Sequence, residues 1–258
     1  LLAFAALLRV LSVALALLQY WGFRLEEHGH RLTVERGLLT RLRTSAPRRR
    51  IQSWTLHEGL LHRWFRRRTL EVDSAVGGDE GSRRRGLREL APIAPPATCD
   101  ELVRHLLPGA PWPPARWQSL HPRAWWRLSL PGAVFALLLA AALCWRAGPW
   151  GLAGLLWLPW AVFVARQHAR RAGYAIDDRL VGARSGWWSR HWRFAEIDKL
   201  QALEVRQSPL DRWLGMATLW LDTAGASSPL RLGLLPLGEA QALRATLGRE
   251  VARRPLRW

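Results

Sequence analysis

Arginine is the residue type of this sequence with the most evident capacity for chemistry. The 258-residue chain has 38 basic and 20 acidic residues, a net charge of +18, and Lys199 is its one lysine. A guanidinium is charged at every physiological pH and binds phosphate or carboxylate through two parallel hydrogen bonds. The pattern therefore predicts an anionic partner. The candidate contact residues are Arg41, Arg43, Arg48, Arg49, Arg50, Arg63, Arg66, Arg67 and Arg68.

Two interpretations of these nine arginines remain open. Held close to a membrane, each could contribute about 1 kcal/mol to contact with anionic lipid headgroups, an effect that falls off over a Debye length. Alternatively, they form a solvated basic face that only orients the chain in the membrane. Nucleic acid is not an expected partner, because no known reading motif accompanies the arginines and they flank apolar segments.

Histidine and cysteine provide no evident catalytic or metal site. His28 and His30 have a spacing found in metal sites, but no Cys, Asp or second histidine group completes a ligand set. The two cysteines are Cys99 and Cys144, and the latter lies inside an apolar run, so a disulfide framework is not expected. We therefore predict a binding protein rather than an enzyme, with no catalytic residue, no metal and no cofactor.

Two apolar runs in the middle of the chain predict a transmembrane helical hairpin at residues 128–166. Residues 130–145 and 150–165 contain no charged side chain, and a short, turn-forming link separates them. Each run falls slightly short of the roughly 20 residues of a typical span, but Trp125 and Trp126 can extend the first at the interface. The weaker alternative is a buried helical pair of a soluble domain, because such helices normally carry a polar stripe.

A third apolar segment predicts a transmembrane helix at residues 1–21. It is uncharged except for Arg9, and it ends with Tyr20 and Trp21, aromatic residues typical of the membrane interface. An arginine near the centre of a span costs on the order of 2.5–3.5 kcal/mol, so we expect Arg9 to reach the surface or face another helix. Since the sequence begins with leucine rather than methionine, we also expect further sequence upstream.

The basic residues also predict the orientation of the chain. They crowd residues 24–127 and the segment from residue 166 onward, whereas the loop of the predicted hairpin offers only Arg146. Basic loops are enriched on the cytoplasmic side of a membrane. The expected protein is thus a multi-pass protein of the cell membrane, with both soluble regions in the cytoplasm and facing the same anionic leaflet.

The two soluble regions are copies of one unit. An offset of 149 residues places Gly37 over Gly186 and keeps the copies aligned over a long stretch without a gap. The predicted organisation is a first domain at 22–107, a linker at 108–127 and a second domain at 172–252. Identical residues at this offset include Gln52 and Gln201, Leu61 and Leu210, Arg63 and Arg212, Trp64 and Trp213, Thr69 and Thr218, Leu70 and Leu219, and Asp73 and Asp222.

Short alternating runs predict β-strands within each copy. Residues 31–36 alternate polar and apolar side chains, a pattern typical of a half-buried strand. Further strands are expected at 51–57 and 69–73, with counterparts in the second copy. Each copy then ends in an amphipathic helix, at 98–107 and 238–251. About seven short strands closed by one helix make a compact, barrel-like domain.

Three motifs of the first copy share their frame with the second copy, where Ser208-Pro209 replaces the Gly-Leu of the last. They are Gly37-Leu38-Leu39, Arg50-Ile51-Gln52-Ser53, and Gly59-Leu60-Leu61 followed by Arg63. Their order, their duplication and their alternation with membrane helices resemble the bacterial pleckstrin-homology-like (PH-like) membrane proteins, formerly domain of unknown function 304, in particular the YdbT-like members. The resemblance implies transmembrane α-helices plus two β-rich PH-like domains, each a split β-barrel or sandwich capped by a C-terminal helix, and a further upstream copy in longer relatives.

The same resemblance implies binding or scaffolding at the inner face of the membrane. The first hypothesis is contact of the domains with anionic lipid headgroups through the nine arginines. The alternative is a protein–protein scaffold or oligomeric assembly factor in envelope stress or antimicrobial-peptide resistance, with a protein partner or a second copy bound at a sheet edge. Tryptophans could anchor such an interface, although core or membrane-surface packing is their more frequent role. The candidates are Trp54, Trp187, Trp188 and Trp192.

Overall fold

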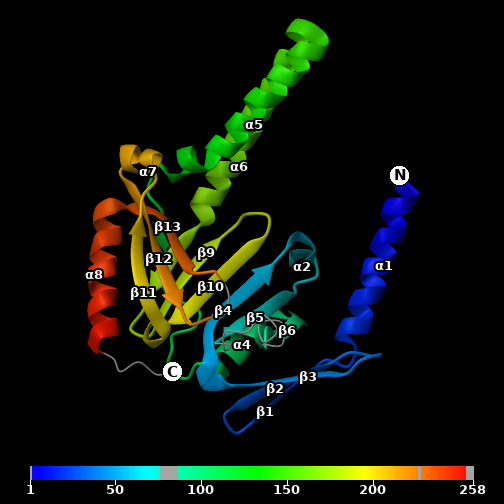
Figure 1. Ribbon diagram of the computed structural model, residues 1–258, viewed down its shortest axis with the longest axis vertical. Coiled ribbons are helices and arrows are strands. Elements are labelled where there is room, and N and C mark those ends of the chain that lie inside the picture. The colour runs from blue at the N-terminus through cyan, green and yellow to red at the C-terminus, as the bar shows by residue number, and fades with distance from the viewer. Residues whose placement is uncertain (1, 76–86, 226–227, 254–258) are drawn as a thin grey trace.

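The computed structural model describes residues 2–75, 87–225 and 228–253. The first copy contains two three-stranded antiparallel layers, preceded by one helix and followed by another (Figure 1). Its elements are α1 (Leu2–Tyr20), β1 (Arg24–His28), β2 (Arg31–Arg36), β3 (Leu42–Pro47), η1 (Arg48–Arg50), β4 (Ile51–Glu58), α2 (Leu60–Trp64), β5 (Arg68–Ser74), β6 (Glu89–Ala94) and α4 (Pro96–Leu106).

The second copy repeats this order after an intervening helical pair. A shift of 149 residues carries β2 onto β9 and η1 onto η3, which confirms the predicted repeat. The described residues form six strands in each copy, close to the expected number of about seven, and a 3-10 turn, η1 or η3, connects the two layers. The elements are β7 (Gln118–Ser119), α5 (Ala124–Ala147), η2 (Gly148–Leu156), α6 (Trp157–Arg171), β8 (Gly173–Ile176), β9 (Leu180–Ser185), β10 (Arg190–Glu196), η3 (Ile197–Lys199), β11 (Leu200–Arg206), α7 (Pro209–Leu214), β12 (Met216–Thr223), β13 (Leu230–Pro236) and α8 (Leu237–Arg253).

The glycines that align the two copies are required by the backbone. Gly37 and Gly186 have φ angles of 108° and 82°, in the left-handed region that side chains rarely adopt. A Cβ atom at Gly37 would overlap the carbonyl oxygen of Thr40, and one at Gly186 would overlap that of Ser189. The turn after β2 and the turn after β9 therefore both depend on glycine.

The two copies share one sheet. Strand β4 of the first copy pairs antiparallel with β10 of the second, with Trp54 opposite Phe194 and Glu58 opposite Arg190. The result is a seven-stranded sheet in the order β6-β5-β4-β10-β9-β8-β7, flanked by the layers β1-β2-β3 and β11-β12-β13. The copies are therefore joined along this seam rather than strung on the predicted linker, whose residues Gln118 and Ser119 form β7 and pair with β8. The domain boundaries themselves stay a prediction.

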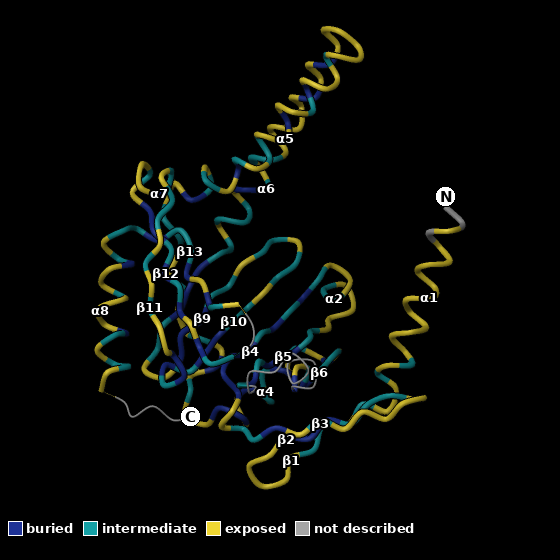
Figure 2. Tube along the Cα trace, in the orientation of Figure 1, coloured by how far each residue is buried: buried dark blue, intermediate teal, exposed yellow. Residues whose placement is uncertain are grey.

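The hydrophobic core of the first copy extends across the seam. It is built mainly by β2, β4, β5 and α4, but it also contains Leu180 and Phe194 of the second copy. Phe194 stacks on Trp54 with 6.3 Å between ring centroids and lies 4.3 Å from the ring of Trp112. The second core lies among β8–β13 and α8. Figure 2 shows buried residues concentrated in the strands of both copies.

Helices α5 and α6 form an antiparallel pair that projects from the strands, and α1 stands apart from this pair, rising from the outer end of β2 and β3 (Figure 1). Among the described residues, the segment Ala124–Arg171 is the one helical stretch long and apolar enough, by length and composition, to cross a membrane. The apolar helix Ala6–Tyr20 is shorter, so a span at residues 1–21 stays a prediction. The chain reverses where the hairpin was expected, but its second arm begins as the 3-10 helix η2. This tighter helix fits because Gly154 packs directly against the backbone of α5 at Ala140.

Candidate membrane-contact surface

Exposed apolar side chains gather on the side of the sheets from which the helices project. They belong to residues 60–65 at α2, 186–189 in the turn between β9 and β10, and 209–214 in α7, which we call the apolar rim (Figure 1). Trp64 is 81% exposed and Trp213 is 79% exposed, although tryptophan in a soluble domain is usually largely buried. The large exposed hydrophobic residues of the rim are Leu60, Leu61, Trp64, Phe65, Trp188 and Trp213.

Direct contacts join the rim to the helical pair. The ring of Phe163 in α6 packs edge-on against Trp187, with 5.5 Å between centroids. Arg63 in α2 donates a hydrogen bond from Nη1 to the carbonyl oxygen of Trp187 at 3.4 Å. Trp187 in turn packs against Trp188 at 4.6 Å. Direct contacts therefore connect α2 of the first copy, the turn between β9 and β10 of the second copy, and helix α6.

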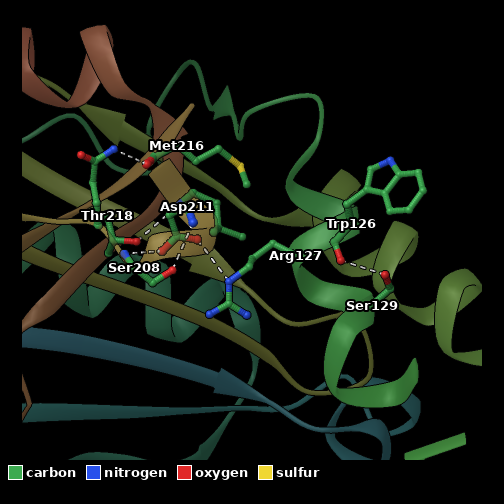
Figure 3. A network of polar contacts seen from close by, with 9 residues as sticks. Trp126, Arg127, Ser129, Ser208, Asp211, Met216 and Thr218 are labelled. Atoms are coloured by element: carbon green, nitrogen blue, oxygen red, sulfur yellow. Dashed lines mark hydrogen bonds and ion pairs between the residues drawn. The ribbon is translucent and has the colours of Figure 1, made fainter. Parts of the chain in front are cut away.

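A buried carboxylate connects α7 to the start of α5 (Figure 3). Arg127 of α5 donates from Nε to Oδ1 of Asp211 at 3.1 Å. Asp211 also closes a capping box, since its backbone N–H donates to Ser208 Oγ at 3.1 Å and its Oδ2 accepts from the backbone N–H of Ser208 at 3.0 Å. The pair fixes the second copy against the base of the helical pair. Sequence reasoning missed Asp211, although Ser208 followed three residues later by an acid is a capping-box signal.

This contact makes a prediction about pH. Burial alone would raise the pKa of Asp211, but hydrogen bonds from Ser208 and the Arg127 guanidinium outweigh it and hold the pKa below the ordinary 3.8. A carboxylate with a lowered pKa stabilises the fold above its unfolded pKa, and that contribution is lost as the pH falls through the folded pKa. Asp211→Asn should therefore cost about 1–3 kcal/mol at pH 7, and less at pH 3, which lies below the ordinary pKa of 3.8, where the contribution has begun to be lost.

Thermal unfolding in detergent micelles at pH 7 and pH 3 measures this difference. Glu101→Gln is the matched control, since Glu101 is an exposed carboxylate of α4. An equal loss of stability at both pH values for Asp211→Asn would show that the carboxylate charge is not what holds α7 to α5.

Five of the nine predicted arginines lie at the rim or beside the end of α1. Arg63, Arg66 and Arg67 belong to the rim or follow it directly, and the last two are exposed. Arg41 and Arg43 are exposed after the turn between β2 and β3. That turn is held to the end of α1 by backbone hydrogen bonds, from the N–H of residue 37 to the carbonyl of residue 21 and from the N–H of residue 38 to the carbonyl of residue 18. Arg43 also pairs with Glu35 at 3.0 Å, and contact of these five side chains with a membrane stays a prediction.

The other four predicted arginines lie elsewhere. Arg48, Arg49 and Arg50 form η1, at the opposite end of β4 from α2, and eight strand residues span about 26 Å. Arg48 connects β1 to α4, because it pairs with Glu27 at 3.7 Å and donates to the carbonyl oxygen of residue 105 at 3.1 Å. Arg68 lies at the seam. The structure therefore does not bring the nine together on one surface.

The two histidines with metal-like spacing lie at the connection between β1 and β2. His28 ends β1 and His30 lies in the turn to β2. Among the residues that the structure describes, no group of three or more His, Cys, Asp or Glu side chains is arranged to hold a metal ion. The rim and its arginines are consequently the site that the geometry offers.

Comparison with known proteins agrees with this architecture. The family model described as "Bacterial PH domain" matches residues 1–108 and 127–251. A curated relative, "UPF0699 transmembrane protein YdbT" of Bacillus subtilis (strain 168), is 22% identical over 233 residues, which are 90% of this chain and 47% of the relative. The chain thus spans about half the length of that relative, and no solved structure matches. Two matched segments that together cover most of the sequence, each with β-rich layers and a closing helix, show that the chain belongs to the bacterial PH domain family.

Proposed function

We propose that this protein holds two fused PH-like copies against a membrane and contacts anionic lipid headgroups through the apolar rim. Membrane association itself accords with the relative's description as a transmembrane protein and with the apolar segment Ala124–Arg171. The observation that carries the proposal is the position of the rim. Its segments connect strands of both copies, and Trp188 of the rim packs against Trp187, which in turn packs against Phe163 of the helical pair.

The chemistry of the rim suits the interface between headgroups and acyl chains. Indole rings favour this zone because they are apolar with one polar edge. Arginines within a Debye length of an anionic leaflet contribute about 1 kcal/mol each. Arg66 and Arg67 follow α2, and Arg212 occupies α7, so both copies present a cation beside an exposed tryptophan. We infer a binding role rather than catalysis, on the cytoplasmic side where basic segments accumulate.

A depth measurement tests this proposal on the whole chain. A spin label at position 64, introduced by Trp64→Cys, should collide more with oxygen than with a water-soluble nickel complex in nanodiscs. A label introduced by Arg49→Cys should show the reverse, because η1 lies at the far end of β4. Cys144→Ala removes one native thiol, while Cys99 is buried and burial raises its pKa to about 11, so it reacts slowly. A label at 64 as exposed to water as the label at 49 contradicts the proposal.

The same label reports on the arginines. Arg66→Gln combined with Arg67→Gln should move the label at 64 toward water in discs that contain phosphatidylglycerol. In discs of phosphatidylcholine alone the double variant should change little, since the attraction needs lipid charge. Both residues are exposed, so loss of the fold is not expected to interfere.

A protein scaffold is a second candidate, favoured by one observation. Strand β11 is the last strand of its layer among the described residues, although its counterpart β4 is paired with β10. An unpaired strand edge can accept a strand from another protein. Cysteine cross-linking along β11 in native membranes distinguishes this role, because a scaffold yields one discrete cross-linked partner or dimer.

A further inference from the structure

The internal repeat leaves two strand edges without a neighbour in the described parts of the chain. At the offset of 149 residues, β3 corresponds to β10 and β4 corresponds to β11. Inside the molecule, β4 of the first copy pairs with β10 of the second. The other two members of this set, β3 and β11, each end a three-stranded layer. Both kinds of edge that meet at the seam therefore occur a second time, at the ends of the flanking layers.

Strand β11 is built as β4 is. The ladder between β4 and β5 shifts register between Ile51 and Ser53. The ladder between β11 and β12 shifts register between Leu200 and Ala202, which is the same place in the repeat. A bulge of this kind bends its strand and increases the local twist. Beyond the bulge, β11 therefore presents an outer edge shaped like the edge of β4 that β10 occupies.

Strand β3 is likewise built as β10 is. Arg43 of β3 lies opposite Glu35 of β2. Their counterparts, Trp192 of β10 and Arg184 of β9, also lie opposite each other. Proline cannot donate to a ladder, and the one proline of β3 is its last residue, Pro47. The rest of the outer edge of β3 can therefore pair with another strand.

Burial differs between β4 and β11 as the missing neighbour requires. Trp54 and Leu56 of β4, each opposite a residue of β10, are both 1% exposed. Their counterparts in β11, Leu203 and Val205, are only half-buried. The core of the second copy is thus open at β11, whereas β10 closes the core of the first copy at β4. An open strand edge beside an apolar core is a template for a further strand.

We propose that β11 pairs antiparallel with β3 of a second copy of this chain, as β4 pairs with β10 within one chain. The register follows from the repeat. Thr55 lies opposite Arg193 in the seam, so Glu204 should lie opposite Thr44 of the second chain. The inference rests on the scaffold role, for which it names the partner, and it does not depend on contact between the rim and lipid.

The proposed interface is head-to-tail, because it uses a different edge of each chain. Every dimer keeps one β3 edge and one β11 edge to which further chains can add, so a series of sizes is expected rather than one symmetric dimer. The contact is also less apolar than the seam, since Leu203 would face Ser45 where Trp54 faces Phe194. We therefore expect the association to be reversible.

Disulfide trapping of the full chain in isolated membranes tests the proposal. The test variant combines Thr44→Cys with Glu204→Cys in a chain that also has Cys144→Ala. Residues directly opposite each other in an antiparallel pair lie about 4.5–5.5 Å apart, within the roughly 4.4–6.8 Å that a disulfide spans between Cα atoms. The control variant has Gln201→Cys in place of Glu204→Cys. Gln201 is also exposed, but it is three residues, or about 10 Å, out of register.

A variant with Thr55→Cys and Arg193→Cys is the positive control, because these residues are opposite each other in the seam. Its disulfide should form within one chain, and mass spectrometry of a digest detects it and verifies the oxidation. Thermal unfolding of each variant in detergent verifies the fold. The depth of the label at position 64 is measured separately, so failure of the assembly and failure of lipid contact are distinguishable.

We expect oxidation of the test variant to give a ladder of disulfide-linked dimers, trimers and longer species, and the control variant to stay monomeric. Glu204→Cys alone should stay monomeric as well, and a dimer of it would mean that β11 pairs with β11, which overturns the proposal. Monomers of the test variant, or equal ladders from the test and control variants, also overturn it. A cross-link from position 204 to a different protein would retain the scaffold role but exclude β3 as its partner.

Discussion

Glu58→Gln is expected to destabilise the whole chain by about 3 kcal/mol, because it removes the carboxylate from two partly buried cations, of which Arg68 keeps Asp100 at 3.6 Å but Arg190 loses its partner in the seam. The Glu58 carboxylate is 8% exposed and lies at the end of β4, on the seam between the copies. It pairs with Arg68 of the first copy at 3.5 Å and with Arg190 of the second at 3.8 Å. Burial lowers the pKa of Arg190, and the charge of Glu58 acts against that shift. The amide has the same shape but no charge, so the loss reports on electrostatics alone.

The measurement is thermal unfolding of the chain in detergent, where a loss of this size lowers the midpoint by at least about 6 °C. Glu204→Gln is the control, since Glu204 also pairs with an arginine but is more than half exposed, and an exposed pair is worth about 0–1 kcal/mol. Similar small losses for both variants would mean that water reaches Glu58 and that the seam does not exclude solvent there.

The elements of each copy could be read from the sequence because their signals are local. Alternation of polar and apolar residues placed β2 at its observed bounds, 31–36, and the apolar periodicity placed α4 and α8 within two residues at each end. The offset of 149 residues then transferred these assignments to the second copy. Helices and turns of this kind are decided by neighbours along the chain, so one sequence is sufficient to find them.

The seam could not be read in the same way. A period of two in a strand tells which side chains share a face, but not which strand lies alongside. Strand β4 is buried along almost its whole length, as in a central strand, yet it contains Gln52 and Ser53, which mask a continuous apolar run. Pairing of β4 with β10 is a contact between residues more than 130 positions apart, and no local pattern encodes it.

The arginines show the same difference between what is local in the sequence and what only the fold brings together. The arginines were grouped because they are close in sequence, but an eight-residue strand separates Arg50 from the rim, and Arg68 pairs inside the seam. Four other arginines, Arg184, Arg193, Arg206 and Arg231, show the opposite case, because they line one cavity of the second copy although they are far apart in the sequence. They come from four strands spread between residues 184 and 231, and only the folded sheet brings them to one cavity. Arginines that are close in the sequence therefore need not share a surface, and arginines that share a surface need not be close in the sequence.

The seam also contains apolar contacts, and removing one of their side chains should lower the free energy of unfolding by a similar amount. Trp54 is 1% exposed and stacks on Phe194 of the other copy with an interplanar angle of 2°. Trp54→Ala should cost about 3–5 kcal/mol, from lost burial and the cavity left behind. Trp213→Ala, at a side chain that is 79% exposed, should change stability by no more than about 0.5 kcal/mol.

A double-mutant cycle with Phe194→Ala measures how far the two copies fold as one unit. Contacting aromatic residues couple by about 0.5–3 kcal/mol, so the double variant Trp54→Ala with Phe194→Ala should lose less than the two single variants combined. Unfolding should also remain a single transition in the parent chain, because one core contains residues of both copies. Additive losses together with two separate transitions would instead describe two independent domains. In that case β4 and β10 would not be paired in solution, and the rim would no longer be one surface.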